Sequence, residues 1–349
     1  PRDLNAQIES LVNRLRRRQV VGSWCVSIET AMLLRQVVSA TRWNQVETLI
    51  KVVKEDVGRR LVMAQPRELA VGNIVRRVLR LIREVYNSEK IRTFSFYGGS
   101  GTGTNTHSSM INLLGDGSPM GAKRASVDDY RKPPNILLIR IIKISINYTH
   151  LHLNVLCSFS EIIMTVGKSR TVEMFLKTAA KKRKFSVLVA ETFPTYLGHE
   201  MALSLSEAGI DTTVISDSAI FAVMSRVNKV IMGTHAVLAN GGLISVSGAQ
   251  MVATAAKHHS KPVVVCTGLY KLSPLYPYDE DSFNDLVAPD PVFSFNEGDL
   301  IDKVTLLNPY YDYVSPELVS LFITNTGGHP PSYLYRLINE NYDPDDTDI

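Results

Sequence analysis

Between residues 162 and 266, short runs of β-branched and other apolar residues alternate with stretches of helical periodicity. The apolar runs are 162–165, 185–189, 212–215, 229–232 and 262–266, and we expect helices at 169–182, 197–208, 217–226 and 245–258. Strands separated by helices of about ten residues form βαβ units, because each helix returns the chain to the same end of the sheet. The pattern therefore predicts an α/β fold with a Rossmann-like, doubly wound parallel-sheet domain at 161–349.

The chain before this region has a different pattern. Over residues 1–92, apolar side chains recur at helical spacing, as they do between Leu69 and Ile82, and this predicts an N-terminal helical domain. Residues 93–134 are rich in Gly, Ser, Thr, Asn and Asp, so we expect a flexible insertion there. Residues 135–160 form a connecting segment rich in β-branched residues, for which we make no functional prediction.

Composition excludes several classes of protein. With 45% hydrophobic and 21% charged residues the chain is typical of globular proteins. The most apolar stretch, 136–156, contains charged residues, so we expect no membrane span. The three cysteines are far apart and odd in number, which argues against a disulfide framework. The printed sequence begins at Pro1 without a charged and then apolar leader, and we expect a cytosolic protein.

The basic residues are concentrated in the helical domain. Residues 1–92 contain 18 Lys and Arg against 9 Asp and Glu, whereas the remainder has a net charge of −5. We therefore consider Arg14, Arg16 and Arg17 as candidates to face an acidic partner. Each of them is equally well explained as an ordinary solvated helix residue. Few aromatic residues lie among these arginines, so direct nucleic-acid binding is not expected.

Ligands of open parallel sheets bind at the carboxyl ends of the strands, near the point where the strand order reverses. The first predicted strand ends in a segment that offers backbone amides, hydroxyls and two cations to an anion: Thr165, Gly167, Lys168, Ser169 and Arg170. A full phosphate loop would need glycine in place of Ile162, so a nucleoside triphosphate site is not predicted. A strand-to-helix turn capped by Ser169 explains the same residues without any ligand.

Two further strand ends carry histidines. His199 stands in Gly198-His199-Glu200, where a zinc motif would need a histidine instead of Leu203, so the histidine is expected in a cap, a pocket or an interface. His235 follows the fourth predicted strand and precedes the Asn240-Gly241 turn, and it could act as a general acid or base, although no companion is evident. No metal, cofactor or catalytic residue is predicted from these patterns.

Longer stretches of the sequence carry a family resemblance. They are 162–165, 169–173, 179–185, 198–202, 219–231, 255–260, 271–274 and 313–335. In these stretches the chain resembles the beta-subunit family of eukaryotic translation initiation factor 2B, one of the regulatory families that are related to sugar-phosphate isomerases. The resemblance is dense over 161–349 and weaker, but still compatible, over the helical domain.

The resemblance implies a function. Members of this family are non-catalytic regulatory subunits of the guanine-nucleotide exchange complex that acts on translation initiation factor 2, and they help to scaffold it and to sense phosphorylation of the alpha subunit of initiation factor 2. Exchange itself belongs to the gamma and epsilon subunits. The implied partners are the alpha, gamma, delta and epsilon subunits of the exchange complex and initiation factor 2, especially with its alpha subunit phosphorylated.

The alternative that the same superfamily implies is a sugar-phosphate isomerase. Those enzymes use a cysteine just after the first strand and an aspartate after the fourth, and the resemblance places Gly167 and His235 at these positions. Moving a proton between adjacent carbons needs both an acid and a base, and glycine supplies neither. The isomerase is therefore disfavoured. The strand ends that form the active site in the isomerases would then persist in this chain as an anion site or as a subunit interface.

Overall fold

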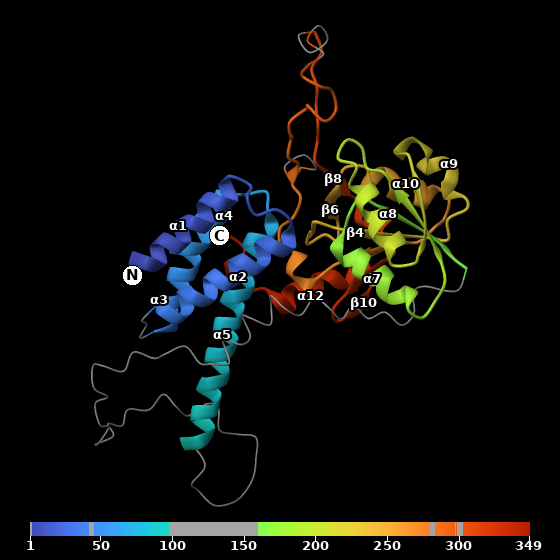
Figure 1. Ribbon diagram of the computed structural model, residues 1–349. Coiled ribbons are helices and arrows are strands. Elements are labelled where there is room, and N and C mark those ends of the chain that lie inside the picture. Colours follow the sequence, from blue (N-terminus) through green and yellow to red (C-terminus); the bar gives the residue numbers. More distant parts are fainter. Residues whose placement is uncertain (1, 42–44, 98–159, 280–282, 297, 299–302) are drawn as a thin grey trace, which may run out of the picture.

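The computed structural model describes residues 2–41, 45–97, 160–279, 283–296, 298 and 303–349 (Figure 1). Most of the predicted insertion and of the connecting segment, residues 98–159, lies outside the described residues. The helical domain consists of α1 (Arg2–Arg16), α2 (Ser23–Ala40), α3 (Val46–Lys51), a π-helical stretch η1 (Val52–Gly58), α4 (Arg59–Ala64) and α5 (Leu69–Tyr97).

The apolar stripes of these helices face one another. Leu34 on α2, Leu49 on α3 and Leu79 on α5 have no exposed surface and belong to one continuous core. Helix α5 continues to Tyr97, beyond position 92, and its second half extends away from the other helices (Figure 1). No helix in the described part of the chain is both long and apolar enough to cross a membrane.

The second domain is built on a seven-stranded sheet in the order β10-β9-β7-β4-β1-β2-β3, and all neighbours are parallel except β10 and β9. The predicted Rossmann-like class is confirmed. Strand order reverses between β1 and β4, which lie side by side with Ile163 opposite Lys229. The strands are β1 (Ile162–Val166), β2 (Ser186–Ala190), β3 (Asp211–Ile215), β4 (Lys229–Gly233), β7 (Val263–Cys266), β9 (Leu321–Thr324) and β10 (Gly327–His329).

Helices cover both faces of this sheet, as a doubly wound fold requires. On one face α7 (Arg170–Ala180) and α8 (Leu197–Glu207) bury Phe175 and Leu205 against the strands. On the other face α9 (Ile220–Met224), α10 (Ala249–His258) and α12 (Leu334–Asn341) form a second core. Short 3-10 helices occur at Asp217–Ala219, Leu269–Lys271, Pro316–Leu318, Pro331–Tyr333 and Pro344–Asp346.

The helix expected over 245–258 begins later than predicted. Residues Leu243–Val246 form strand β6, which pairs with β5 (Ala236–Val237) and β8 (Tyr311–Val314) in a small antiparallel sheet. Helix α10 starts only at Ala249, after Gly248 has taken a positive φ of 93°. The apolar run at 243–246 is thus a strand, because its pairing partner Tyr311–Val314 is supplied from a distant part of the chain.

Candidate functional site

A cavity of about 840 Å³ lies between the two domains, where β1 and β4 end. Its walls come from both domains: Ser23, Trp24 and Glu68 from the helical domain, and Ser169, His235 and Lys271 from the α/β domain. The cavity therefore occupies the position where the strand order of the sheet reverses, which is where open α/β folds bind ligands. Its location agrees with the strand ends predicted to hold a site, and about a third of its lining residues belong to the helical domain.

The turn after β1 brings the start of α7 to this cavity. Ser169 is the N-cap of α7, and its hydroxyl accepts a hydrogen bond from the Val172 amide at 3.5 Å. Gly233 at the end of β4 makes the close approach possible, because a Cβ on this glycine would lie 2.2 Å from Ser169 Oγ. The predicted cap is confirmed, and the helix start points its free amides toward the cavity end of the sheet.

Both cations of the turn after β1, Lys168 and Arg170, contact side chains of other helices. Lys168 Nζ bonds to Glu200 at the start of α8, and this carboxylate raises the pKa of the lysine. The guanidinium of Arg170 lies over the Trp24 ring from α2, 5.2 Å from its centroid. Arg170 thereby connects the α/β domain to the helical domain across the cavity.

His235 is the centre of a polar cluster that sequence reasoning did not find. Its Nδ1 lies 3.2 Å from Ser23 Oγ, and its Nε2 lies 3.1 Å from the Tyr311 hydroxyl and 3.2 Å from Glu68 Oε1. Glu68 is only 5% exposed, and its Oε1 accepts no hydrogen bond among the described residues. Burial, reinforced by the Glu68 charge, raises the pKa of Tyr311, so the hydroxyl stays protonated.

Lys271 adds a buried cation to the same region. Its side chain lines the cavity and its Nζ donates a hydrogen bond to the Thr234 carbonyl at 2.6 Å. Burial lowers the pKa of this ammonium group to about 8, and the nearby Glu68 carboxylate acts in the opposite direction. An amine with such a pKa gains or loses its proton close to neutrality.

The other residues proposed for a pocket lie outside the cavity lining. Thr165 is buried within β1, and Gly167 has a positive φ of 60°. His199 is more than half exposed and lies 3.9 Å from Glu191. The turn residue Asn240 donates a hydrogen bond to the Tyr313 hydroxyl at 2.8 Å, and Gly241 adopts a φ of 85° beside it. The structure thus brings together Lys168, Ser169, Arg170 and His235 out of the predicted set.

Gly198 explains the Gly-His-Glu sequence at the start of α8 without any ligand. A Cβ on this glycine would lie 2.0 Å from the Ala190 carbonyl at the end of β2. The helix can therefore pack this closely on the strand only because residue 198 has no side chain.

The candidate basic residues of α1 differ from one another. Arg14 pairs with Glu29 of α2, with nitrogen to oxygen distances of 2.6 and 2.7 Å. Arg16 and Arg17 are exposed at the end of the helix. Of the three candidates, Arg16 and Arg17 therefore present their charge to solvent, whereas the charge of Arg14 is paired with Glu29.

Comparison with known proteins identifies the family of the chain and then the subunit type that it resembles. Residues 19–331 match the Initiation factor 2 subunit family, and the chain belongs to that family. Within it, the chain is similar to translation initiation factor eIF2B subunit beta of Schizosaccharomyces pombe, with 49% identity over 97% of this chain and 96% of the relative. The predicted resemblance to the beta subunit is confirmed.

Solved structures agree with this similarity. The crystal structure of eIF2B beta from Chaetomium thermophilum has a TM-score of 0.73 and 31% identity, covering 99% of this chain and 94% of that one. The tetrameric eIF2B-beta2-delta2 complex from C. thermophilum contains a chain with a TM-score of 0.67 and 30% identity, covering 97% of this chain and 95% of that one. A 5-methylthioribose 1-phosphate isomerase from Pyrococcus horikoshii shares the fold, at 16% identity and a TM-score of 0.55.

Proposed function

We propose that this chain is a regulatory, non-catalytic subunit of the guanine-nucleotide exchange complex that acts on translation initiation factor 2. It scaffolds the complex through the delta subunit and further through the alpha, gamma and epsilon subunits, and it helps to sense phosphorylation of the alpha subunit of initiation factor 2 in the cytosol. The observation that carries the proposal is the 49% identity to an eIF2B subunit beta over almost the full length of both chains.

The geometry of the strand ends supports a non-catalytic role. Gly167 occupies the position of the isomerase cysteine in the resemblance, and its φ of 60° disfavours any side chain there. A Cβ at this position would also lie 3.1 Å from Val246 Cγ1. His235, at the position of the aspartate, is held by Ser23 and Tyr311. The thiol of Cys25 on α2 lines the cavity. An isomerase assay must therefore test whether this cysteine acts as a catalytic group.

The cavity itself retains features of an anion site. The free amides of α7, Arg170 and the buried Lys271 lie around the same space, and positive charge at a helix start favours an anionic ligand. We infer that this end of the sheet either holds a small anion or serves as a surface between subunits. Lys168 has the smaller part in this, because Glu200 already neutralises it.

Coexpression followed by native mass spectrometry tests the proposal directly. The chain is produced alone and together with delta, alpha, gamma and epsilon subunits from the same source. A heteromer containing this chain together with the delta subunit is expected, and the assembly should accelerate nucleotide release from initiation factor 2. The proposal would be overturned if the chain formed a homo-oligomer whether or not the other subunits are present, and if this homo-oligomer isomerised a sugar phosphate with an activity that Cys25→Ser abolishes.

A further inference from the structure

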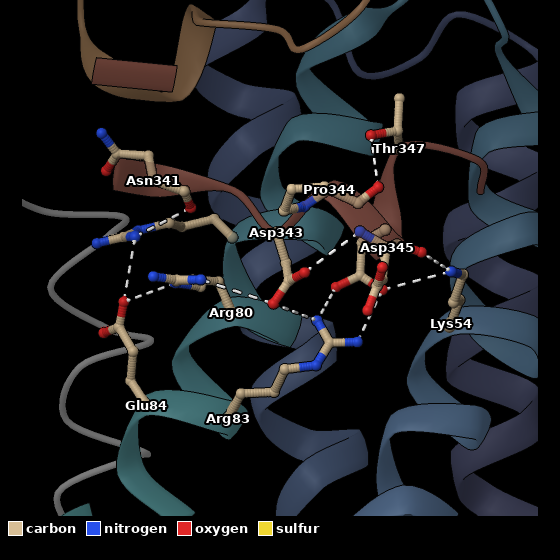
Figure 2. Close-up of polar contacts among 11 residues, drawn as sticks. Lys54, Arg80, Arg83, Glu84, Asn341, Asp343, Pro344, Asp345 and Thr347 are labelled. Atoms are coloured by element: carbon tan, nitrogen blue, oxygen red, sulfur yellow. Dashed lines mark hydrogen bonds and ion pairs between the residues drawn. The ribbon is translucent and has the colours of Figure 1, made fainter. Parts of the chain in front are cut away.

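The acidic segment, residues 342–349, crosses from the α/β domain to the helical domain. At its start Tyr342 is 3% exposed, and its hydroxyl donates a hydrogen bond to the Leu272 carbonyl at 2.6 Å. The segment then passes along α5, where Figure 2 shows its side chains facing Arg80 and Arg83. In Figure 1 the mark of the C-terminus lies among the helices of the first domain. The last residues of the chain are therefore part of the helical domain in space.

Charge complementarity is strong along this contact. The acidic segment carries Asp343, Asp345, Asp346 and Asp348. The Asp346 side chain has no exposed surface, receives hydrogen bonds from both terminal nitrogens of Arg83, and lies 3.4 Å from Lys54 Nζ. Asp343 lies 3.6 Å from Arg80 and 3.4 Å from Arg83. Two-pronged bonds between guanidinium and carboxylate are geometrically specific, so this is a defined docking site for an acidic segment.

The backbone of the segment is bound as well. Arg76 of α5, which is 4% exposed, donates from Nε to the Asp346 carbonyl at 3.1 Å and from a terminal nitrogen to the Thr347 carbonyl at 2.8 Å. Burial lowers the pKa of this guanidinium, and the charge of Asp346 opposes the effect. A buried guanidinium is costly unless it is hydrogen-bonded, so the helical domain needs these carbonyls.

Ile349 completes the contact on the apolar side. Its side chain packs against the core of the helical domain. A Cβ on Gly58 would be in ordinary van der Waals contact with Ile349 Cγ2, at 3.5 Å, so the isoleucine packs beside this glycine. The acidic segment is thus held by ion pairs, by backbone hydrogen bonds and by an apolar contact, all with the helical domain.

The start of α5 connects this contact to the cavity. Glu68 immediately precedes the helix and lines the cavity, Asn73 donates to the Tyr270 carbonyl at 3.1 Å, and Arg76 and Arg83 hold the acidic segment. Glu68 directly precedes α5, and Asn73, Arg76 and Arg83 lie on it, so one helix links all of these contacts. A shift of α5 away from the acidic segment therefore also moves one wall of the cavity.

We propose that residues 342–349 are a strap that fixes the helical domain against the α/β domain and thereby holds the two walls of the cavity in their observed positions. The arginine face of α5 is the docking surface of the strap, and the occupant is the acidic segment of the same chain. Release of the strap separates the two walls of the cavity without unfolding either core.

Hydrogen exchange of the full-length chain with Asp346→Asn tests the strap. Amides on both walls of the cavity, around residues 23–26 and 233–236, should exchange at least tenfold faster, whereas amides in the middle of β1 and β2 keep their rates. Asp345→Asn is the matched control, because Asp345 is exposed and, among the described residues, its carboxylate forms no ion pair with α5. This variant should leave both walls unchanged.

Two results would overturn the proposal. Faster exchange confined to the acidic segment itself would show that it does not control the cavity. An equal acceleration throughout both domains would show a loss of global stability instead. If Asp346→Asn fails to fold, Asp343→Asn provides the same test, because its carboxylate is 18% exposed and its loss is milder. Unchanged cavity walls in that folded variant would also overturn the strap.

Discussion

His235 Nε2 lies 3.2 Å from Glu68 Oε1, and this contact joins the end of β4 to the residue that precedes α5. Lys271 and Tyr311 lie in the same cluster, and the Glu68 charge influences the pKa of both. The polar groups at the junction of the two domains are therefore electrostatically coupled, and their behaviour with pH reports on the junction itself.

The stability of the protein should rise with pH above about 8 because of Lys271. Burial places the pKa of this lysine at about 8 in the folded chain against 10.5 in the unfolded one. Between these values the unfolded state binds more protons, so the free energy of unfolding increases as pH rises. The full contribution is about 3 kcal/mol. It is absent below pH 8, where both states are protonated.

Denaturant unfolding at pH 7, 8, 9 and 9.5, compared between the wild type and Lys271→Met, measures this contribution. The free energy of unfolding of the wild type should rise relative to that of Lys271→Met across the series, because only the wild type contains the titrating lysine. Measurements stop at pH 9.5, since tyrosines begin to ionise near pH 10 in the unfolded chain. Parallel pH profiles of the two proteins would contradict the assignment of this pH dependence to Lys271.

Glu68→Gln should lower the pKa of Lys271 further. The carboxylate favours the protonated lysine, and the substitution removes its charge while it keeps the size of the side chain. The rise in stability with pH should consequently begin at a lower pH than in the wild type. The same unfolding series detects the shift, and an onset that stays in place would show that Glu68 does not raise the pKa of Lys271.

Gly198→Ala should destabilise the protein by about 2 kcal/mol or more, because the added methyl group would overlap the Ala190 carbonyl and force α8 away from β2. Leu203→Ala on the same helix is the control, since Leu203 is 63% exposed, and it should change stability by less than about 0.5 kcal/mol. Thermal or denaturant unfolding measures both. Equal stabilities of the two variants would refute the close packing.

Arg16→Glu combined with Arg17→Glu should slow association with initiation factor 2 several-fold at low salt, and the effect should fade as salt increases. Arg14 is left unchanged, because its reversal would also break the pair with Glu29. The control reverses Lys181 and Lys182, which are exposed cations on the other domain. Stopped-flow measurements give the association rates, and an unchanged rate in the α1 variant would contradict the prediction that α1 faces this partner.

Local patterns were sufficient for much of the fold. Strands β1, β2, β3, β4 and β7 and the cap at Ser169 follow from runs and signatures within a few residues of one another. The small sheet was missed because β8 pairs with β6 across a long stretch of chain. A four-residue apolar run does not by itself distinguish a strand from the start of a helix.

The candidate site was predicted only in part for the same reason. The turn from Lys168 to Arg170 is contiguous and therefore visible in the sequence. The companions of His235 are not: Ser23 is 212 positions away and Tyr311 is 76 positions away. Neither residue carries a motif, and only the packing of the helical domain on the strand ends brings them to the histidine.

The ion pair between Arg83 and Asp346 spans 263 positions of the chain. During synthesis the helical domain leaves the ribosome first, but Arg76 and Arg83 lack their acceptors until residues 342–349 have been made. Contacts between such distant positions form late, because the chain must first lose the entropy of a long loop. The first domain to be translated is consequently among the last to be completed, and in a chain that stops before residue 342 the buried Arg76 lacks the two carbonyl acceptors that the acidic segment supplies.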